Sequence, residues 1–219
     1  MTAPTRPGCI LLADVSEAQH AVDWRFLRAQ GVRGVIVRAS EGEWHPDPFW
    51  TLHATSAAED GALPVGSYHA FHPRHADPTD QARRYMDRAY DRTALAPVLD
   101  VELAEGQPLD VVAERALDAL AWLADAWGKT PWLYTGADFG AQLAAASPRW
   151  RAEAWRFPLW LADYRAAAHA PAPWARWTAW QWIATPTITS YPLDLSWFEG
   201  DELSLAALGA SSRGEPSAA

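Results

Sequence analysis

Two carboxylic acids end the apolar stretch LAPVLDVE at residues 95–102. Side chains of a β-strand alternate between its two faces, so Asp100 and Glu102 point to one face and Val101 to the other. Two neighbouring acids that a fold buries cannot both ionise cheaply, and one of them keeps its proton to a higher pH. Such an acid is suited to general acid catalysis near neutral pH. The alternative interpretation is a solvated pair of acids that simply begins a loop.

Polar residues also follow the other apolar runs of the chain. The pattern predicts strands at 9–14, 34–39, 63–71, 95–102, 130–135, 157–162, 177–182 and 187–194. The residues at or just past their carboxyl ends are Asp14, Glu41, His69, Asp100, Glu102, Tyr134, Asp163, Gln181 and Asp194. Strands that alternate with helices favour a parallel sheet covered by helices, and about eight of them favour a barrel. The rim at the carboxyl ends of barrel strands carries the active site in such folds.

The helical stretches between these strands are unequal in length. The clearest helix is predicted at 108–127, where apolar residues recur every three or four positions before Gly128. Several connections after Thr135 are too short for full helices. We therefore predict an α/β fold, a single-domain irregular (β/α) barrel of the TIM type with an incomplete outer ring of helices. The expected bounds are an N-terminal extension at 1–8, the catalytic barrel at 9–209 and a disordered tail at 210–219.

Composition narrows the classes of partner. The chain has 219 residues, of which 49% are hydrophobic, enough to bury a substantial core. The net charge of −9, with Lys129 as the one lysine, argues against nucleic acid as a partner. No apolar run is long enough to insert in a membrane, and Cys9 alone forms no internal disulfide. Residues 1–9 lack the pattern of a Sec-type signal, so we expect synthesis in the cytoplasm without one.

A rim of acids bordered by Trp and Tyr side chains fits glycoside hydrolysis, which needs a proton donor and negative charge near an oxocarbenium-like transition state. The 14 tryptophans offer flat apolar faces to sugar rings, although core packing explains many of them. Crowded acids also bind Mg²⁺ or Ca²⁺. The spacing of His69, His72 and His75 is compatible with zinc, but Pro73 and their place after a strand favour loop histidines. We expect neither a metal nor a cofactor.

Seven ordered motifs span the chain from about residue 10 to 208. They are DVS at 14–16 with Gln19 and Trp24, VRASEG at 37–42, GALPVGSYH at 61–69, LDVE at 99–102, WLADY at 160–164, WQW at 180–182 and LDL at 193–195. On these motifs the chain resembles the glycoside hydrolase family 25 muramidases, the Chalaropsis-type lysozymes. Two positions depart from the family pattern: Ser196 stands where Asn is frequent, and Asp163 is at a variable position.

The resemblance implies an irregular β/α barrel that cleaves the β-1,4 bond between N-acetylmuramic acid and N-acetylglucosamine in peptidoglycan. It implies that Glu102 is the general acid and that Asp100 orients the 2-acetamido group or stabilises charge at the anomeric carbon. Asp14 and Asp194 would complete the acidic pocket. The residues expected to contact substrate are Glu41, Tyr68, His69, Tyr134, Trp160, Tyr164, Gln181 and Trp182. Core packing is the alternative for each aromatic residue.

Two other functions remain open on the sequence: a catalytically silent glycan-binding barrel, and a glycosidase that acts on another N-acetylated polymer such as chitin. The spacing of Asp100 and Glu102 fits either stereochemical outcome, and we hypothesise assistance by the substrate's own acetamido group. The expected partners are peptidoglycan glycan strands, bound by a monomer. The expected place of action is the cell wall, either as a phage or prophage endolysin or as a bacterial enzyme exported by another route.

Overall fold

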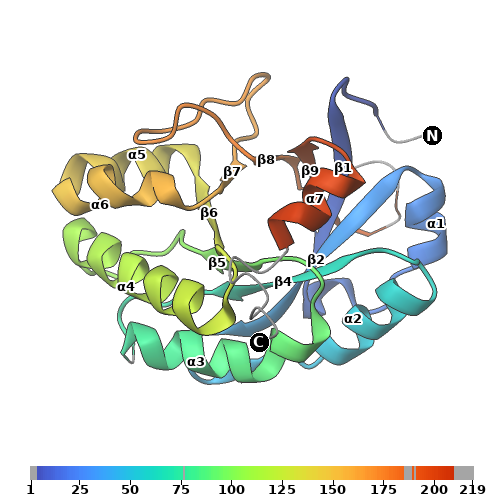
Figure 1. Cartoon of the computed structure of the whole chain (residues 1–219), viewed down its shortest axis with the longest axis horizontal. Helices are drawn as coiled ribbons and strands as arrows, with labels where there is room; N and C mark the ends of the chain where they lie inside the picture. The colour runs from blue at the N-terminus through green and yellow to red at the C-terminus, as the bar shows by residue number, and fades with distance from the viewer. Residues whose placement is uncertain (1–3, 76, 185–188, 190, 210–219) are drawn as a thin grey trace, which may run out of the picture.

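A computed structural model describes residues 4–75, 77–184, 189 and 191–209. Within these residues eight strands close into a barrel, and the short strand β3 extends β2 (Figure 1). The strands are β1 (Cys9–Val15), β2 (Val32–Glu41), β3 (His45–Pro46), β4 (Val65–Ala70), β5 (Pro97–Asp100), β6 (Trp132–Gly136), β7 (Leu159–Ala162), β8 (Ala179–Ile183) and β9 (Asp194–Glu199). Around the barrel the order is β1-β9-β8-β7-β6-β5-β4-β2, and pairing of β1 with β2 closes the ring.

The helices cover part of this ring. They are α1 (Trp24–Ala29), α2 (Trp50–Glu59), α3 (Pro78–Ala89), α4 (Leu109–Trp127), α5 (Ala137–Ala146), α6 (Pro148–Glu153) and α7 (Glu202–Gly209), with 3₁₀ turns η1 (Glu17–Gln19), η2 (Tyr90–Arg92) and η3 (Ala154–Arg156). Figure 1 shows α1 to α6 around the right, lower and left sides of the barrel, and a loop between β7 and β8 at the top. The predicted irregular barrel with an incomplete outer ring is confirmed. No helix in the described ranges is long and apolar enough to cross a bilayer.

Strand β9 differs from the prediction in both position and direction. The predicted last strand, 187–194, begins among residues outside the described set, and residues 191–193 are not strand. The strand instead begins at Asp194 and runs antiparallel to β1 and β8. Because β9 runs the other way, its start lies at the rim where the parallel strands end. Asp14 and Asp194 are therefore direct cross-strand partners.

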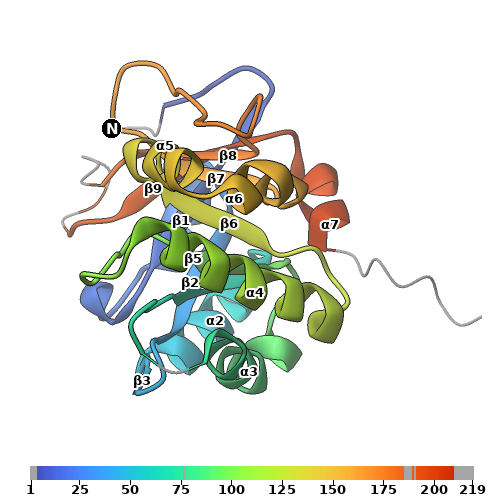
Figure 2. The ribbon, with the colours of Figure 1, turned by 90° about the vertical axis from the view of Figure 1, so that its left-hand side faces the viewer.

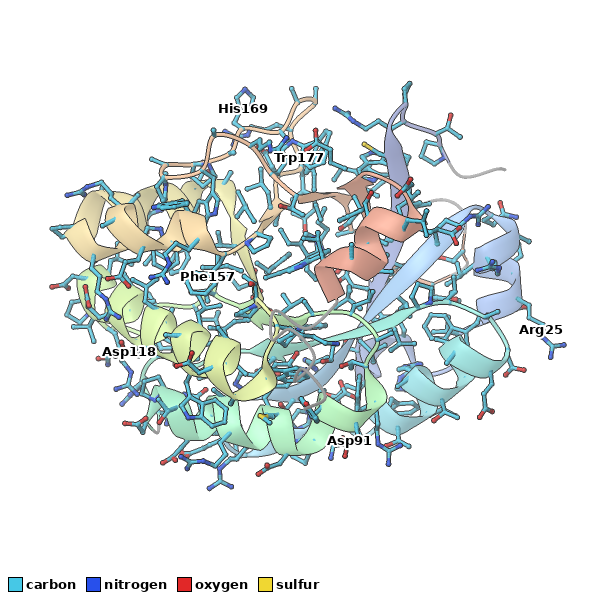
Figure 3. All side chains as sticks on the ribbon, in the orientation of Figure 1. Arg25, Asp91, Asp118, Phe157, His169 and Trp177 are labelled. Atoms are coloured by element: carbon cyan, nitrogen blue, oxygen red, sulfur yellow. The ribbon has the colours of Figure 1, made fainter. Side chains whose placement is uncertain are left out.

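Helix α4 shows how the sequence builds the outer layer. Its buried side chains recur every three or four residues along one face, and Gly128 ends it with a positive φ of 71° that suits glycine. The short helix α6 was not predicted, although Ser147 caps it through the backbone N–H of Trp150 and Pro148 opens it. Charged side chains such as those of Arg25 and Asp118 lie on the outside of the helices (Figure 3).

The barrel interior is a separate apolar core. Its buried residues are Leu12, Ile36, Leu95, Ala96, Val98, Trp132, Tyr134, Trp160, Ala179, Phe198 and Leu205. Leu205 comes from α7, which covers the end of the barrel opposite β3 and the loop into α4 (Figure 2). Gly34 lets the Leu205 side chain approach the barrel, because a Cβ at position 34 would lie 2.9 Å from Leu12 Cδ2 and 3.0 Å from Leu205 Cδ2. The closed end leaves the opposite mouth for the site.

Candidate active site

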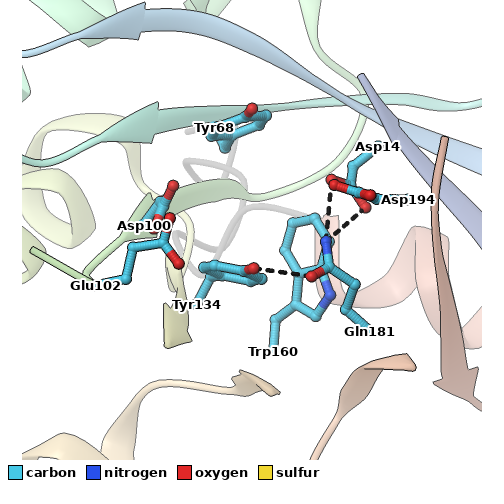
Figure 4. A pocket seen from close by; sticks show the side chains of 8 residues that line it. All are labelled: Asp14, Tyr68, Asp100, Glu102, Tyr134, Trp160, Gln181 and Asp194. Carbon is cyan, nitrogen blue, oxygen red and sulfur yellow. Dashed lines mark hydrogen bonds between the residues drawn. The ribbon is translucent and has the colours of Figure 1, made fainter. Parts of the chain in front are cut away.

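A cavity of about 100 Å³ opens at the rim where the parallel strands end (Figure 4). Its lining residues are Asp14, Tyr68, Asp100, Glu102, Tyr134, Trp160, Gln181 and Asp194. Pockets that take a drug-sized ligand measure roughly 300–1,000 Å³. The cavity is therefore suited to one ring-sized unit of a larger ligand, and the rest of that ligand must lie on the surrounding rim.

The acids stand in two couples on opposite sides of this cavity. Asp100 is the last residue of β5 and Glu102 follows it by two, and both side chains face the cavity from one side (Figure 4). Asp14, the next-to-last residue of β1, lies next to Asp194 of β9 on the other side. Because side chains alternate between the faces of a strand, the acids at these three strand ends point into the same space.

Burial governs the ionisation of the first couple. Burial raises the pKa of Asp100 well above its usual range, and the charge of Glu102 raises it further. Burial also raises the pKa of Glu102. The buried Oδ1 atom of Asp100 has no hydrogen-bond partner among the described residues. The couple therefore holds a proton at higher pH than ordinary acids do.

The second couple is shifted in the same direction. Burial raises the pKa of Asp14 well above its usual range, and the nearby charge of Asp194 adds to the shift. Burial raises the pKa of Asp194 to about 6, and the charge of Glu102 contributes. Because the two couples influence each other across the cavity, the four acids do not all ionise together near neutral pH.

The side-chain amide of Gln181 connects the second couple to two tyrosines. Its Nε2 atom donates to Oδ1 and Oδ2 of Asp14, each at 3.2 Å. Its Oε1 atom accepts hydrogen bonds from the hydroxyls of Tyr134 at 2.9 Å and Tyr164 at 2.6 Å. These bonds assign the orientation of the amide, with its NH₂ group toward Asp14.

The cavity wall is aromatic. Tyr134 and Trp160 meet edge to face with ring centroids 5.0 Å apart, and the Trp160 Nε1 donates to Ser196 Oγ at 2.9 Å. Aromatic rings with fixed orientation offer apolar faces to a sugar ring. A site with two couples of protonatable acids and aromatic walls has the groups that glycoside hydrolysis requires.

Comparison with known proteins agrees with this chemistry. Residues 13–191 match the sequence profile of Glycosyl hydrolases family 25. The chain belongs to glycosyl hydrolase family 25. It is a glycoside hydrolase of the lysozyme type, and peptidoglycan is the substrate of this family's lysozymes.

Relatives of this family 25 enzyme include bacterial and fungal proteins. Lysozyme M1 of Streptomyces globisporus is 25% identical over 208 residues, which cover 89% of this chain and 69% of that protein. The muramidase from Trichobolus zukalii superposes with a TM-score of 0.80 at 26% identity, over 91% of this chain and 98% of that one. The bacterial lysozyme from Streptomyces coelicolor shares the fold, with a TM-score of 0.83 at 24% identity over 93% and 98% of the two chains.

Two residues predicted to contact substrate lie elsewhere in the family 25 barrel. His69 is fully buried, with its Nδ1 atom 2.9 Å from Ser40 Oγ, and burial lowers its pKa to about 4. Trp182 stacks on Trp197 at 5.6 Å in the core outside the barrel. Neither residue lines the cavity, and the reason is the same for both: each follows a cavity-lining residue in its strand, so it points to the other face.

Two further predicted residues lie at the edge of the cavity of the family 25 enzyme. Tyr164 is exposed and reaches the cavity through its hydroxyl bond to Gln181. Its loop is anchored by Asp163, whose carboxylate accepts from Arg165 and from the backbone N–H of His169. Burial alone would raise the pKa of Asp163, but these hydrogen bonds outweigh it and lower the pKa to about 2.

Glu41 belongs to an ion-pair network that sequence reasoning missed. The guanidinium of Arg38 contacts carboxylate oxygens of Glu17 at 2.8 Å, Glu41 at 3.0 Å and Asp47 at 2.9 Å. His72 lies on the other side of Glu41, with its Nε2 atom 3.0 Å from Glu41 Oε1. The signal for the network was an arginine inside an apolar strand, which needs partners when it is buried. No group of three or more His, Cys, Asp or Glu side chains in the described ranges is arranged to hold a metal ion.

Proposed function

We propose that Glu102 is the general acid with which this enzyme hydrolyses the β-1,4 bond between N-acetylmuramic acid and N-acetylglucosamine. The observation that carries the proposal is the position of Asp100 and Glu102 at the end of β5, facing the Asp14 and Asp194 couple across an aromatic cavity. Burial raises the pKa of Glu102, so its carboxyl group retains a proton to give at higher pH than an exposed glutamate does. Family membership supplies the substrate class.

In the first chemical step Glu102 gives its proton to the glycosidic oxygen as the bond from that oxygen to the anomeric carbon breaks. The acetamido oxygen of the muramic acid forms a bond to the same carbon, and the electron pair of the broken bond stays with the departing oxygen. Asp100 accepts a hydrogen bond from the acetamido N–H and so holds the group in place. The contact is supported by the position of Asp100 in the cavity lining.

In the second step the Glu102 carboxylate takes a proton from a water molecule, and the water oxygen bonds to the anomeric carbon. The bond between the acetamido oxygen and that carbon breaks at the same time, which restores the acetamido group and the protonated Glu102. Two displacements at one carbon give net retention of configuration. The ionised member of the Asp14 and Asp194 couple holds negative charge beside the sugar during both steps.

The test of Glu102 is mass analysis of muropeptides released from purified cell walls. We expect Glu102→Gln to fold as the wild type does and to lose activity by roughly 10²–10⁴-fold, the usual contribution of general acid catalysis. The matched control is Glu59→Gln, an exposed glutamate of α2 that lies outside the cavity. Release of the same reducing-end muramic acid products at the wild-type rate by Glu102→Gln would contradict the assignment.

The role of the acetamido group has its own test. A glycan substrate that lacks the 2-acetamido group at the cleaved residue should be hydrolysed far more slowly than the natural glycan, because it cannot supply the internal nucleophile. Equal rates on both substrates would rule out substrate assistance and leave the role of Glu102 intact.

A further inference from the structure

Trp44 is an exposed tryptophan at the active-site end of the barrel. It lies in the turn between β2 and β3 and is 50% exposed, while only Trp155 among the other tryptophans is exposed. Its ring is held from several sides. The ring centroids of His72 and His75 lie 5.0 and 4.7 Å from that of Trp44, both edge to face.

The backbone below the ring makes room for it. Gly42 has a positive φ of 54°, and a Cβ at this position would lie 2.8–3.1 Å from three atoms of the Trp44 indole. The ring therefore occupies space that any other residue type at position 42 would fill. We call Trp44 with Gly42, His72 and His75 the Trp44 platform. An exposed aromatic ring whose position is already set loses little freedom when a ligand stacks on it.

The Trp44 platform is tied to the loop that carries the proposed acid. His72 Nδ1 lies 2.7 Å from Glu105 Oε1, and the backbone N–H of Arg74 donates to Glu105 Oε2 at 3.2 Å. Glu105 follows Glu102 by three residues and has a φ of 49°, a left-handed conformation that is strained for a non-glycine residue. The contacts with His72 and Arg74 hold this strained turn in place.

The platform also adjoins the wall of the cavity. His72 Nε2 lies 3.0 Å from Glu41 Oε1 at the end of β2, and the charge of Glu41 contributes to the raised pKa of Asp100. The Trp44 turn and the loop leading into α4 lie at the same end of the barrel (Figure 2). A glycan strand whose cleaved residue fills the small cavity must place its neighbouring sugars on this end.

The charges around Trp44 indicate which part of the wall polymer it takes. Glu41, Glu43 and Glu105 surround the platform, and Glu43 is exposed. Carboxylates accept hydrogen bonds from sugar hydroxyl and amide groups, but they repel an anionic ligand. An uncharged N-acetylglucosamine ring, with an apolar face and several donors at its edge, fits both the indole and the acids.

We propose that the Trp44 platform is an additional sugar subsite that binds an N-acetylglucosamine residue of the glycan strand outside the cavity. The proposal rests on the proposed function, because it assigns a place to the strand that the cavity cleaves. Its distinctive consequence is a dependence on chain length. The subsite contributes to binding only when the glycan is long enough to reach it.

The test compares Trp44→Ala with the wild type on tetra-, hexa- and octasaccharides of the peptidoglycan repeat and on longer strands. We expect KM to rise about 3- to 10-fold on the longest glycans, the effect of losing one aromatic stacking contact, with kcat unchanged. The rise should shrink as the glycan shortens and vanish on the shortest one that the subsite cannot reach. Trp44→Tyr should restore most of the affinity.

The matched control is Trp155→Ala, since Trp155 is 60% exposed and lies in η3, away from the β2–β3 turn. It should leave KM unchanged at every length. The proposal is overturned if Trp44→Ala has no effect on long strands, if its loss is the same at all lengths, or if Trp155→Ala matches it. Cleavage of the tetrasaccharide at the wild-type rate in Trp44→Ala would show that the catalytic assignment stands whichever result is obtained.

Discussion

The amide of Gln181 donates to both carboxylate oxygens of Asp14, at 3.2 Å each, because two tyrosine hydroxyls occupy its oxygen atom. If the amide turned over, its oxygen would face the carboxylate of Asp14, and both hydrogen bonds from Nε2 would be lost. Hydrogen bonds to the charged form of an acid favour that form. Gln181 therefore opposes the burial and the neighbouring charge that raise the pKa of Asp14.

The first prediction concerns this amide. Gln181→Met removes both donors to Asp14, so the pKa of Asp14 should rise further, because the hydrogen bonds that favour its charged form are lost. Carboxyl ¹³C NMR titration measures this directly. Tyr164→Phe is the control, because Tyr134 still holds the amide, and the titration of Asp14 should barely move. An unchanged Asp14 titration in Gln181→Met would contradict the assignment.

The second prediction concerns the stability of the crowded acids. Asp194 has a folded-state pKa of about 6, above its ordinary value of 3.8, so the folded protein binds its proton more tightly than the unfolded chain does. The stability that the folded protein gains from this proton is fully present below about pH 4. It is lost as the pH rises through 6. At pH 8 Asp194→Asn should therefore be more stable than the wild type.

We expect this gain to be on the order of 1–2 kcal/mol at pH 8, after allowance for partial exposure of the side chain, and close to zero at pH 4. Calorimetric melting at the two pH values measures it. Asp91→Asn, at an exposed position in η2, should show no such pH dependence. If Asp194→Asn were equally stabilised at both pH values, or destabilised at pH 8, the predicted effect of Asp194 ionisation on stability would be contradicted.

The third prediction concerns Arg38. Asp47 is fully buried and ion-paired with Arg38, so Arg38→Ala leaves a buried carboxylate without its counterion and should cost about 3–5 kcal/mol at pH 7. Urea unfolding at pH 7 provides the measurement. Arg25→Ala breaks an exposed pair with Asp60 and should cost no more than about 1 kcal/mol.

The fourth prediction concerns the closed end of the barrel. Leu205→Ala removes a fully buried side chain from the barrel interior and should lower the free energy of unfolding by about 2–5 kcal/mol. Leu203→Ala, in the same helix but exposed, should change it by less than about 0.5 kcal/mol. Denaturant unfolding distinguishes the two. Similar costs for both variants would show that α7 packs differently.

The sequence predicted the barrel because apolar runs and helical periodicity alternate along most of the chain. The position of β9 was predicted wrongly because short apolar runs flank Asp194 on both sides. Its direction was predicted wrongly because the residue pattern of one short strand does not indicate whether the strand is parallel or antiparallel to its neighbours. Asp194 still reaches the rim because the reversed strand begins there. The antiparallel pairing with β1 is a tertiary property that local periodicity does not encode.

Six of the eight residues that line the cavity were expected at strand ends, because rim position follows from strand order, whereas Tyr68 and Trp160 were expected only through the family resemblance. His69 and Trp182 were also expected at the site, but each is the strand neighbour of a lining residue. Strict alternation from Tyr68 and Gln181 places both on the face away from the cavity. The contacts of Arg38 and of the Trp44 platform join segments distant in sequence, so no local pattern could supply them.

Pairing of Cys9 with Glu199, and the hydrogen bond from Gly200 N–H to the Gly8 carbonyl at 2.9 Å, place the entry and exit of the barrel side by side. Both points lie at the end that α7 covers, away from the cavity. A flexible tether that begins at the end of the last helix would thus start behind the enzyme. Anchoring the protein to a bead or a targeting module at that end leaves the glycan-facing mouth unobstructed.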